Sequence, residues 1–178
     1  KAVVIACNTA SAVAFQHLKK IYDIPLFDVV SPSVEYSLKI TKTQKIGVVG
    51  TYSTIQSRAY KRMFKDLGDT CTIQEIPCPL FVPIIEEGWA NSSIARGIAK
   101  IYLNDFTNSD IDTLILGCTH YPIMANTIQA LLSNQIQLVY SGETVGHKLA
   151  DYLMKKNCES SFDVLRSVQF FVTDYPQK

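Results

Sequence analysis

The sequence predicts an α/β protein with two similar lobes, each built on a mainly parallel sheet flanked by helices. Segments typical of strands and of helices alternate along the whole chain, as they do in parallel sheets covered by helices. The strand segments are continuous aliphatic runs, which indicates burial on both faces of the sheet. With 178 residues, of which 47% are hydrophobic and 19% charged, the chain can form one sizeable core or two small lobes.

The first half of the chain contains four predicted strands with helices between them. Asn8 or Thr9 can cap the first helix, and Pro32 lies near the first turn of the second, where proline is favoured. Gly68 ends the third helix, because glycine readily adopts the left-handed conformation that follows a helix. In order, we expect a strand at 2–6, a helix to 20, a strand at 26–30, a helix from 31, a strand at 45–50, a helix at 54–67 and a strand at 71–76.

The second half continues this alternation. A short apolar segment at 80–88 ends in the paired acids Glu86 and Glu87. A serine at 92 or 93 opens a helix whose apolar face is expected to contain Ile94, Ile98, Ile101 and Tyr102. The remaining expected elements are a strand at 113–117, a helix at 123–132, a strand at 136–140, a helix at 143–156 and a strand at 168–172.

The two lobes are expected to divide the chain unevenly. Residues 1–35 and 140–178 would form the first lobe, and residues 36–139 a second lobe inserted into it, with the ligand crevice between them. The chain begins with Lys1 rather than Met and opens directly into a strand. We therefore expect it to be part of a longer chain, with the first lobe incomplete because its amino-terminal strands are absent.

Composition argues against several classes of partner. Lysine and arginine total 17 and aspartate and glutamate 16, a net charge of +1, and the basic residues are scattered, so we expect no nucleic-acid partner and no membrane surface. No apolar stretch reaches the roughly 18 residues that cross a bilayer.

The five cysteines are odd in number and lack the spacing of a disulfide framework. A reducing, cytoplasmic location is therefore expected.

Cys7 and Cys118 each lie just after a predicted strand and just before polar residues. Ligands of open α/β sheets bind beyond the carboxyl ends of the strands, so we expect both thiols to face a common crevice. Cys7 also precedes a helix start, and a helix N-terminus stabilises the thiolate that acts as a base. Two thiols facing one substrate carbon suit a reaction that removes a proton from one face and returns it to the other. A lone cysteine is more commonly buried and inert, so the pair carries this prediction.

The neighbours of Cys118 extend this pattern. His120 can share or relay the proton of the thiol, and Glu86 or Glu87 can orient His120 as the third member of a Cys/His/Glu relay. The alternative for His120 is a structural histidine, and the paired acids are, from spacing alone, more commonly a solvated helix C-terminus. Cys118 and His120 supply at most two ligands where zinc needs three or four, so no metal site is expected.

The other cysteines and histidines carry no chemical prediction. Cys71, Cys78 and Cys158 have no histidine or acidic partner in the sequence and are interpreted as packing residues. His17 and His147 lie in helical patterns with no polar constellation nearby, so we interpret both as ordinary surface or packing residues.

Four segments resemble motifs of the bacterial glutamate racemases, within the aspartate/glutamate racemase family. Two surround the cysteines: residues 6–12, Ala-Cys-Asn-Thr-Ala-Ser-Ala, and residues 117–122, Gly-Cys-Thr-His-Tyr-Pro. Residues 79–86 resemble the family's acidic motif, and residues 171–176 its carboxy-terminal stretch. The related aspartate racemases usually carry an acidic residue where the His-Tyr-Pro of residues 120–122 stands here.

The resemblance implies cofactor-independent interconversion of L- and D-glutamate, an isomerase reaction that supplies D-glutamate for peptidoglycan and so for cell-wall biogenesis and cell shape. Cys7 and Cys118 would be the two proton donors and acceptors, with His120 and Glu86 assisting Cys118. Family members commonly pair, so the resemblance also implies a homodimer. The residues that match the family's substrate-holding positions are Asn8, Thr9, Thr119 and His120.

The family's Asp-Ser-Gly and Pro-Tyr-Gly motifs precede the residues present here. The aspartate is expected to assist Cys7, and both motifs help to bind glutamate. We therefore expect the isolated 178 residues to be inactive.

Two other functions stay open on the residues alone. A cysteine hydrolase or transferase would use Cys118, His120 and Glu86 as nucleophile, base and orienting group, and would leave Cys7 without a role. A non-catalytic amino-acid-binding module would close its lobes on a small ligand.

Overall fold

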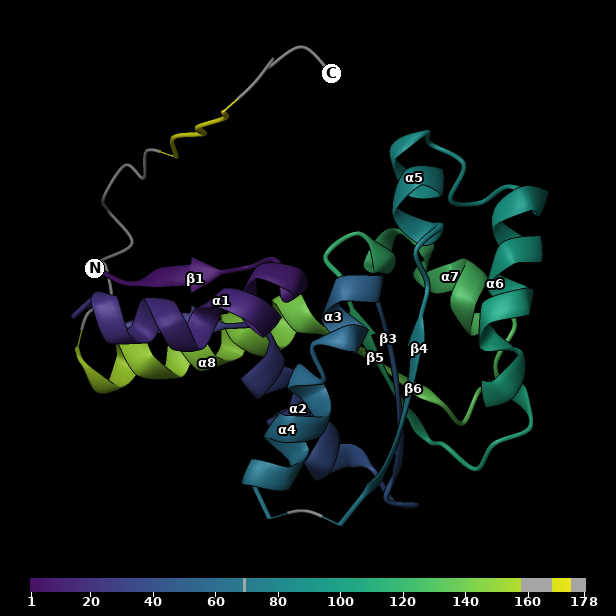
Figure 1. The fold of residues 1–178 in the computed structure, drawn as a ribbon, viewed down its shortest axis with the longest axis horizontal. Helices are drawn as coiled ribbons and strands as arrows, with labels where there is room; N and C mark the ends of the chain where they lie inside the picture. The colour runs from purple at the N-terminus through teal and green to yellow at the C-terminus, as the bar shows by residue number, and fades with distance from the viewer. Residues whose placement is uncertain (69, 158–167, 174–178) are drawn as a thin grey trace.

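The computed structural model describes residues 1–68, 70–157 and 168–173. It contains two parallel sheets, shown in Figure 1. The smaller sheet pairs β1 (Val3–Ile5) with β2 (Leu26–Asp28), and the larger has the strand order β4-β3-β5-β6. Helices flank both sheets, so the predicted α/β fold is confirmed.

Strands β3 (Lys45–Gly50) and β5 (Thr113–Gly117) form the centre of the larger sheet, between β4 (Thr72–Pro77) and β6 (Gln137–Tyr140). All five residues of β5 are buried. Successive side chains of a strand point to opposite faces, so Leu114 and Leu116 pack into one apolar cluster while Ile115 packs into the other. Burial on both faces explains why these strands are continuous aliphatic runs.

The helices divide between the two faces of the larger sheet and the smaller sheet. In Figure 1, α5, α6 and α7 lie beyond one face, α2 and α4 lie beyond the other, and α1 and α8 lie beside the smaller sheet. Phe27 of β2 meets Tyr152 of α8 edge to face, with ring centroids 5.3 Å apart. The helix bounds are α1 Asn8–Ile21, α2 Val30–Ile40, α3 Tyr52–Gln56, α4 Ala59–Asp66, α5 Phe81–Glu86, α6 Ser93–Thr107, the 3-10 helix η1 Tyr121–Met124, α7 Ala125–Gln129 and α8 Ser141–Lys155.

The predicted helix at 54–67 is in fact two helices, α3 and α4. They are separated by Arg58, which has a left-handed backbone with φ 55°. The predicted helix at 123–132 is also wrong in extent, because η1 and α7 together end at Gln129.

The predicted apolar face of α6 is confirmed only in part, because Ile98 and Tyr102 pack against the core and two isoleucines do not. Ile94 and Ile101 are 53% and 74% exposed. The fully buried residues of the helix are Ala95, Ala99, Leu103 and Phe106.

The predicted strand at 168–172 is also wrong, since residues 168–173 have no regular structure and Phe170 is 90% exposed. Cys158 and residues 174–176 of the carboxy-terminal stretch lie outside the described residues. None of the helices in the described ranges has the length and apolar character needed to cross a bilayer.

Candidate active site

Cys7 and Cys118 follow strands of different sheets. Cys7 lies two residues beyond β1, and Cys118 comes directly after β5. Burial raises the pKa of the Cys118 thiol, the backbone N–H groups of His120 and Tyr121 lower it, and a thiolate at Cys7 raises it again. A negative charge on Cys7 thus disfavours a second negative charge on Cys118.

Cys7 is the residue that caps the N-terminus of α1. Its backbone is extended, and its Sγ accepts a hydrogen bond from the Ala10 N–H at 3.5 Å. The thiol is exposed, so a ligand can reach it.

Cys118 begins a line of three polar side chains. Its Sγ lies 3.9 Å from Nδ1 of His120, and Nε2 of the same ring lies 3.3 Å from Oε1 of Glu86. The thiol is only 7% exposed, whereas the Glu86 side chain is 63% exposed. An exposed contact of this kind contributes only about 0–1 kcal/mol to the stability of the fold. Of the two paired acids, Glu86 is the one in contact with His120.

Asn8 is buried beneath the start of α1, with 1% of its surface exposed. Its Nδ2 donates to the hydroxyl of Tyr60 and to Oγ of Ser141, both at 2.9 Å. These two bonds use both hydrogens of the amide. Its Oδ1 is buried and has no hydrogen-bond partner among the described residues. The side chain is therefore held by the protein, with one acceptor atom left over.

Thr9 and Thr119 present hydroxyls on the two sides of the site. Thr9 Oγ1 lies 2.9 Å from Thr51 Oγ1 and 3.0 Å from Thr54 Oγ1, and the latter two are 3.0 Å apart. These three side chains form a closed hydroxyl triangle between α1 and the start of α3. Thr119 is exposed, and its Oγ1 lies 3.4 Å from Nδ1 of His120.

Sequence reasoning missed four side chains that touch the candidate site residues. Thr51 follows β3 directly, so the position beyond a strand end that singled out Cys118 also marks Thr51. Tyr60 and Ser141 carry no such signal, because the fold alone brings them to Asn8. Thr54 is revealed only by the structure, in which its hydroxyl completes the triangle with Thr9 and Thr51.

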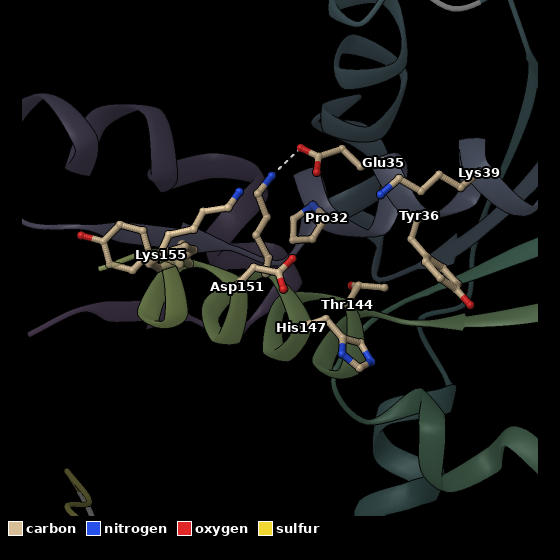
Figure 2. Close-up of a pocket in the computed structure, with 11 residues that line it drawn as sticks. Pro32, Glu35, Tyr36, Lys39, Thr144, His147, Asp151 and Lys155 are labelled. Atoms are coloured by element: carbon tan, nitrogen blue, oxygen red, sulfur yellow. Dashed lines mark hydrogen bonds and ion pairs between the residues drawn. The ribbon is translucent and has the colours of Figure 1, made fainter. Parts of the chain in front are cut away.

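A separate groove of about 610 Å³ lies between α2 and α8, as Figure 2 shows. Its walls carry charges of both signs, including Lys39 and Asp151, and Lys148 forms an ion pair with Glu35 there. His147 lines this groove and is exposed, in agreement with its interpretation as a surface residue. Neither of the site cysteines lines it.

Within the described ranges, no three histidine, cysteine or acidic side chains lie close enough together to hold a metal ion.

Residues 1–145 match the family described as Asp/Glu/Hydantoin racemase. The chain belongs to this family. It is 42% identical to the glutamate racemase of Sulfurihydrogenibium sp. (strain YO3AOP1), over 97% of this chain and 64% of that protein. It is 40% identical to the glutamate racemase of Persephonella marina (strain DSM 14350 / EX-H1), with the same coverage of 97% and 64%. The chain thus spans 64% of the length of these curated racemases.

Solved glutamate racemases share the fold. Glutamate racemase isoform RacE1 of Bacillus anthracis has a TM-score of 0.84 and 35% identity, over 88% of this chain and 59% of that one. The enzyme of Francisella tularensis subsp. tularensis SCHU S4, solved in complex with D-glutamate, has a TM-score of 0.82 and 33% identity, over 92% and 60%. The resemblance to the bacterial glutamate racemases is therefore confirmed.

Proposed function

We propose that the natural full-length protein containing this chain is an amino-acid racemase that interconverts L- and D-glutamate without a cofactor. Membership of the racemase family and the names of its relatives support the reaction. The Francisella relative was solved with D-glutamate, and the Escherichia coli glutamate racemase, with a TM-score of 0.68 and 25% identity, with L-glutamate. Two mirror-image ligands of one amino acid favour glutamate as the substrate here.

The observation that carries the proposal is the path of two hydrogen bonds from Asn8, beside Cys7, through Ser141 to Leu116, two residues before Cys118. One sulfur, as thiolate, takes the α-proton from one face of the substrate, and the other, as thiol, gives a proton to the opposite face. Burial raises the pKa of Cys118, which favours its protonated form and suits it to donate. After one turnover Cys7 holds the proton and Cys118 is the thiolate, and the reverse reaction starts from that state.

His120 and Glu86 assist Cys118 in this scheme. When Nε2–H of His120 donates to the Glu86 carboxylate, Nδ1 is left as an acceptor facing the Cys118 sulfur. The ring can then accept the thiol proton or return it. Such a carboxylate–imidazole–thiol line resembles the activation of cysteine nucleophiles, so a hydrolase or transferase is the second candidate. That reaction leaves Cys7 without a role.

Glutamate would be held by donors at the helix starts. The N-terminus of α1 offers unpaired N–H groups beside Asn8 and Thr9, and the turn after β5 offers Thr119 and His120. A carbanion-like transition state carries negative charge onto the substrate carboxylate, and preorganised donors stabilise that charge. No step of the proton exchange requires a group other than the two thiols and the side chains around them.

The proposal also covers the lobes of the protein, its cellular location and its assembly. Residues 1–35 with 140–178 form one lobe and residues 36–139 the other, which puts Cys7 and Cys118 on different lobes with the substrate between them. The protein acts in the cytoplasm, where its product D-glutamate enters peptidoglycan and so supports the cell wall and cell shape. Two copies pair as a homodimer. The isolated 178 residues are inactive.

The test uses Cys7→Ser and Cys118→Ser in the natural full-length protein. Racemisation is followed in both directions by circular dichroism, and uptake of solvent deuterium at the α-carbon by mass spectrometry. Each variant should lose at least about a hundredfold in rate, the scale of a general base. Cys71→Ser, outside the site, is the matched control and should keep the rate. Near-normal rates for either site variant remove that cysteine from the mechanism.

Two other outcomes identify the alternatives. A covalent acyl-enzyme on Cys118 that also forms in Cys7→Ser indicates a hydrolase or transferase. Glutamate binding without any deuterium uptake by the wild-type protein indicates a binding module.

A further inference from the structure

We propose that Tyr60 and Ser141 are positioning residues for the racemisation: through the side chain of Asn8 they fix the separation of the Cys7 and Cys118 sulfur atoms. This inference rests on the proposed function and assigns a role to two side chains that do not touch the reacting atoms.

The first link runs from Cys7 to Asn8. Asn8 follows Cys7 directly in the chain and is the first residue of α1, so a shift of the Asn8 backbone also moves the cap that carries the thiol. Its amide donates to Tyr60 of α4 and to Ser141 of α8, each at 2.9 Å. Two acceptors on two different helices fix both the position and the tilt of a planar amide. The start of α1 is therefore anchored from two sides.

The second link runs from Ser141 to the strand that carries Cys118. Ser141 Oγ donates to the backbone oxygen of Leu116 at 3.0 Å, and Leu116 lies two residues before Cys118 on β5. The route from one thiol to the other thus contains two hydrogen bonds, Asn8 to Ser141 and Ser141 to Leu116. It joins α1, beside the smaller sheet, to a central strand of the larger one.

Tyr60 reaches the same strand by direct contact. Its side chain is fully buried, and a Cβ placed on Gly117 would lie 3.2 Å from its hydroxyl. Gly117 is the residue before Cys118, so the phenol packs against the backbone that leads into the second thiol. Burial raises the pKa of Tyr60, which keeps the phenol neutral and able to accept from Asn8. Tyr60 therefore contacts the neighbours of both cysteines.

Asn8, Tyr60 and Ser141 form a hydrogen-bond network that is buried in the core. Asn8, Tyr60 and Ser141 are 1%, 0% and 3% exposed, so water cannot replace a lost partner without entering the core. A buried donor without an acceptor is unfavourable, so the amide is expected to move when one acceptor is deleted. A misplacement of about 1 Å between reacting groups can lower a rate by about a hundredfold.

The test compares Tyr60→Phe and Ser141→Ala in the natural full-length protein, each of which deletes one hydroxyl. Tyr22→Phe is the matched control, because Tyr22 is 54% exposed at the far end of α1. The variants are assayed in both directions of racemisation, at a temperature where far-ultraviolet circular dichroism shows them folded. We expect kcat to fall about ten- to a hundredfold in both directions and KM to change less than about threefold.

A second readout is independent of activity. A short bifunctional thiol reagent is allowed to bridge Cys7 and Cys118, and the bridged peptides are quantified by mass spectrometry. Tyr60→Phe and Ser141→Ala should lower the yield of the bridge at least about threefold, while single alkylation of exposed Cys7 by iodoacetamide keeps its rate. A change in the spacing of the two thiols lowers the yield of the bridge and leaves the alkylation rate of Cys7 unchanged.

Each outcome decides the inference. A fall in kcat with KM kept and bridging reduced supports it. Unchanged kcat and bridging, or a fall in kcat with unchanged bridging, overturns it. Should one variant fail to fold, the other still deletes an acceptor of the same amide and decides in its place. A wild-type protein that does not racemise glutamate refutes the proposed function, and the bridging yield then judges the thiol spacing alone.

Discussion

Replacing Gly117 by alanine tests how closely the backbone packs at the end of β5. A Cβ at this position would lie 2.7 Å from the backbone oxygen of Val49 and 3.2 Å from the ring of Tyr60. Real Cβ atoms do not approach other atoms closer than 3.0 Å, so the strands must separate by at least about 0.3 Å. The oxygen belongs to the neighbouring strand β3 and cannot rotate away as a flexible side chain would.

Two effects of opposite sign determine how much Gly117→Ala changes the free energy of unfolding. Forcing an extra methyl group into a well-packed core costs about 1–3 kcal/mol. Removing a glycine restricts the unfolded chain and returns about 0.4–1 kcal/mol. The packing cost is the larger, so we expect Gly117→Ala to lower the free energy of unfolding by about 1–2 kcal/mol. Because Cys118 is the next residue, the same shift should also lower the rate of racemisation.

The matched control is Gly97→Ala in α6, where an added Cβ meets nothing within 4 Å. Alanine is better than glycine in a helix interior by about 0.8–1 kcal/mol, so this variant should be more stable than the wild type. Both free energies of unfolding are measured by urea denaturation, followed by far-ultraviolet circular dichroism. A Gly117→Ala variant as stable as the wild type, with Gly97→Ala stabilised as expected, would refute the close-packing argument.

Two further predictions concern the fold. Partial burial alone would raise the pKa of Asp112, but hydrogen bonds from Thr41 and from two backbone N–H groups lower it to about 2, below the usual 3.8. Its stabilising contribution is therefore complete above pH 3.8 and is lost as the pH falls towards 2. Asp112→Asn should flatten the loss of stability in this range, and an unchanged acid titration would contradict this assignment. Phe81 is fully buried, with ring centroids 5.1 Å from Tyr121 and 5.4 Å from Tyr102. Phe81→Ala should lower the free energy of unfolding by about 3–5 kcal/mol, and a urea-measured loss under about 1 kcal/mol would show that the ring is not part of the core.

The central strands were predictable because one physical cause dominates there. The predicted bounds of β3 and β5, residues 45–50 and 113–117, are confirmed, since burial on both faces demands an unbroken aliphatic run. The division of the helix at Arg58 was not predictable, because the left-handed residue is neither glycine nor asparagine. The buried face of α6 was predicted only in part because Ile94 and Ile101 lie on the exposed side, and pattern alone cannot tell which apolar stripe meets the core.

The residues of the candidate site also divide into those that the sequence indicates and those that only the folded structure reveals. Cys7 and Cys118 could be found because each comes just beyond a strand end, where sequence and topology agree. The contact of Glu86 rather than Glu87 with His120 depends on how α5 packs against η1, which no local pattern encodes. Tyr60 and Ser141 lie 52 and 133 positions from Asn8, so only the folded chain reveals that they share one amide.

The triangle of Thr9, Thr51 and Thr54 has a consequence for any ligand that reaches it. Three hydroxyl protons serve three edges, so a head-to-tail ring uses every proton and turns only lone pairs outward. The ring can run clockwise or anticlockwise without moving a heavy atom, and each bond strengthens the next. A carboxylate that approaches the triangle meets only acceptors until one hydroxyl rotates outward to donate to it, and this rotation breaks one hydrogen bond of the ring. A ligand that accepts the proton of the Thr9 hydroxyl would therefore break one hydrogen bond between α1 and α3.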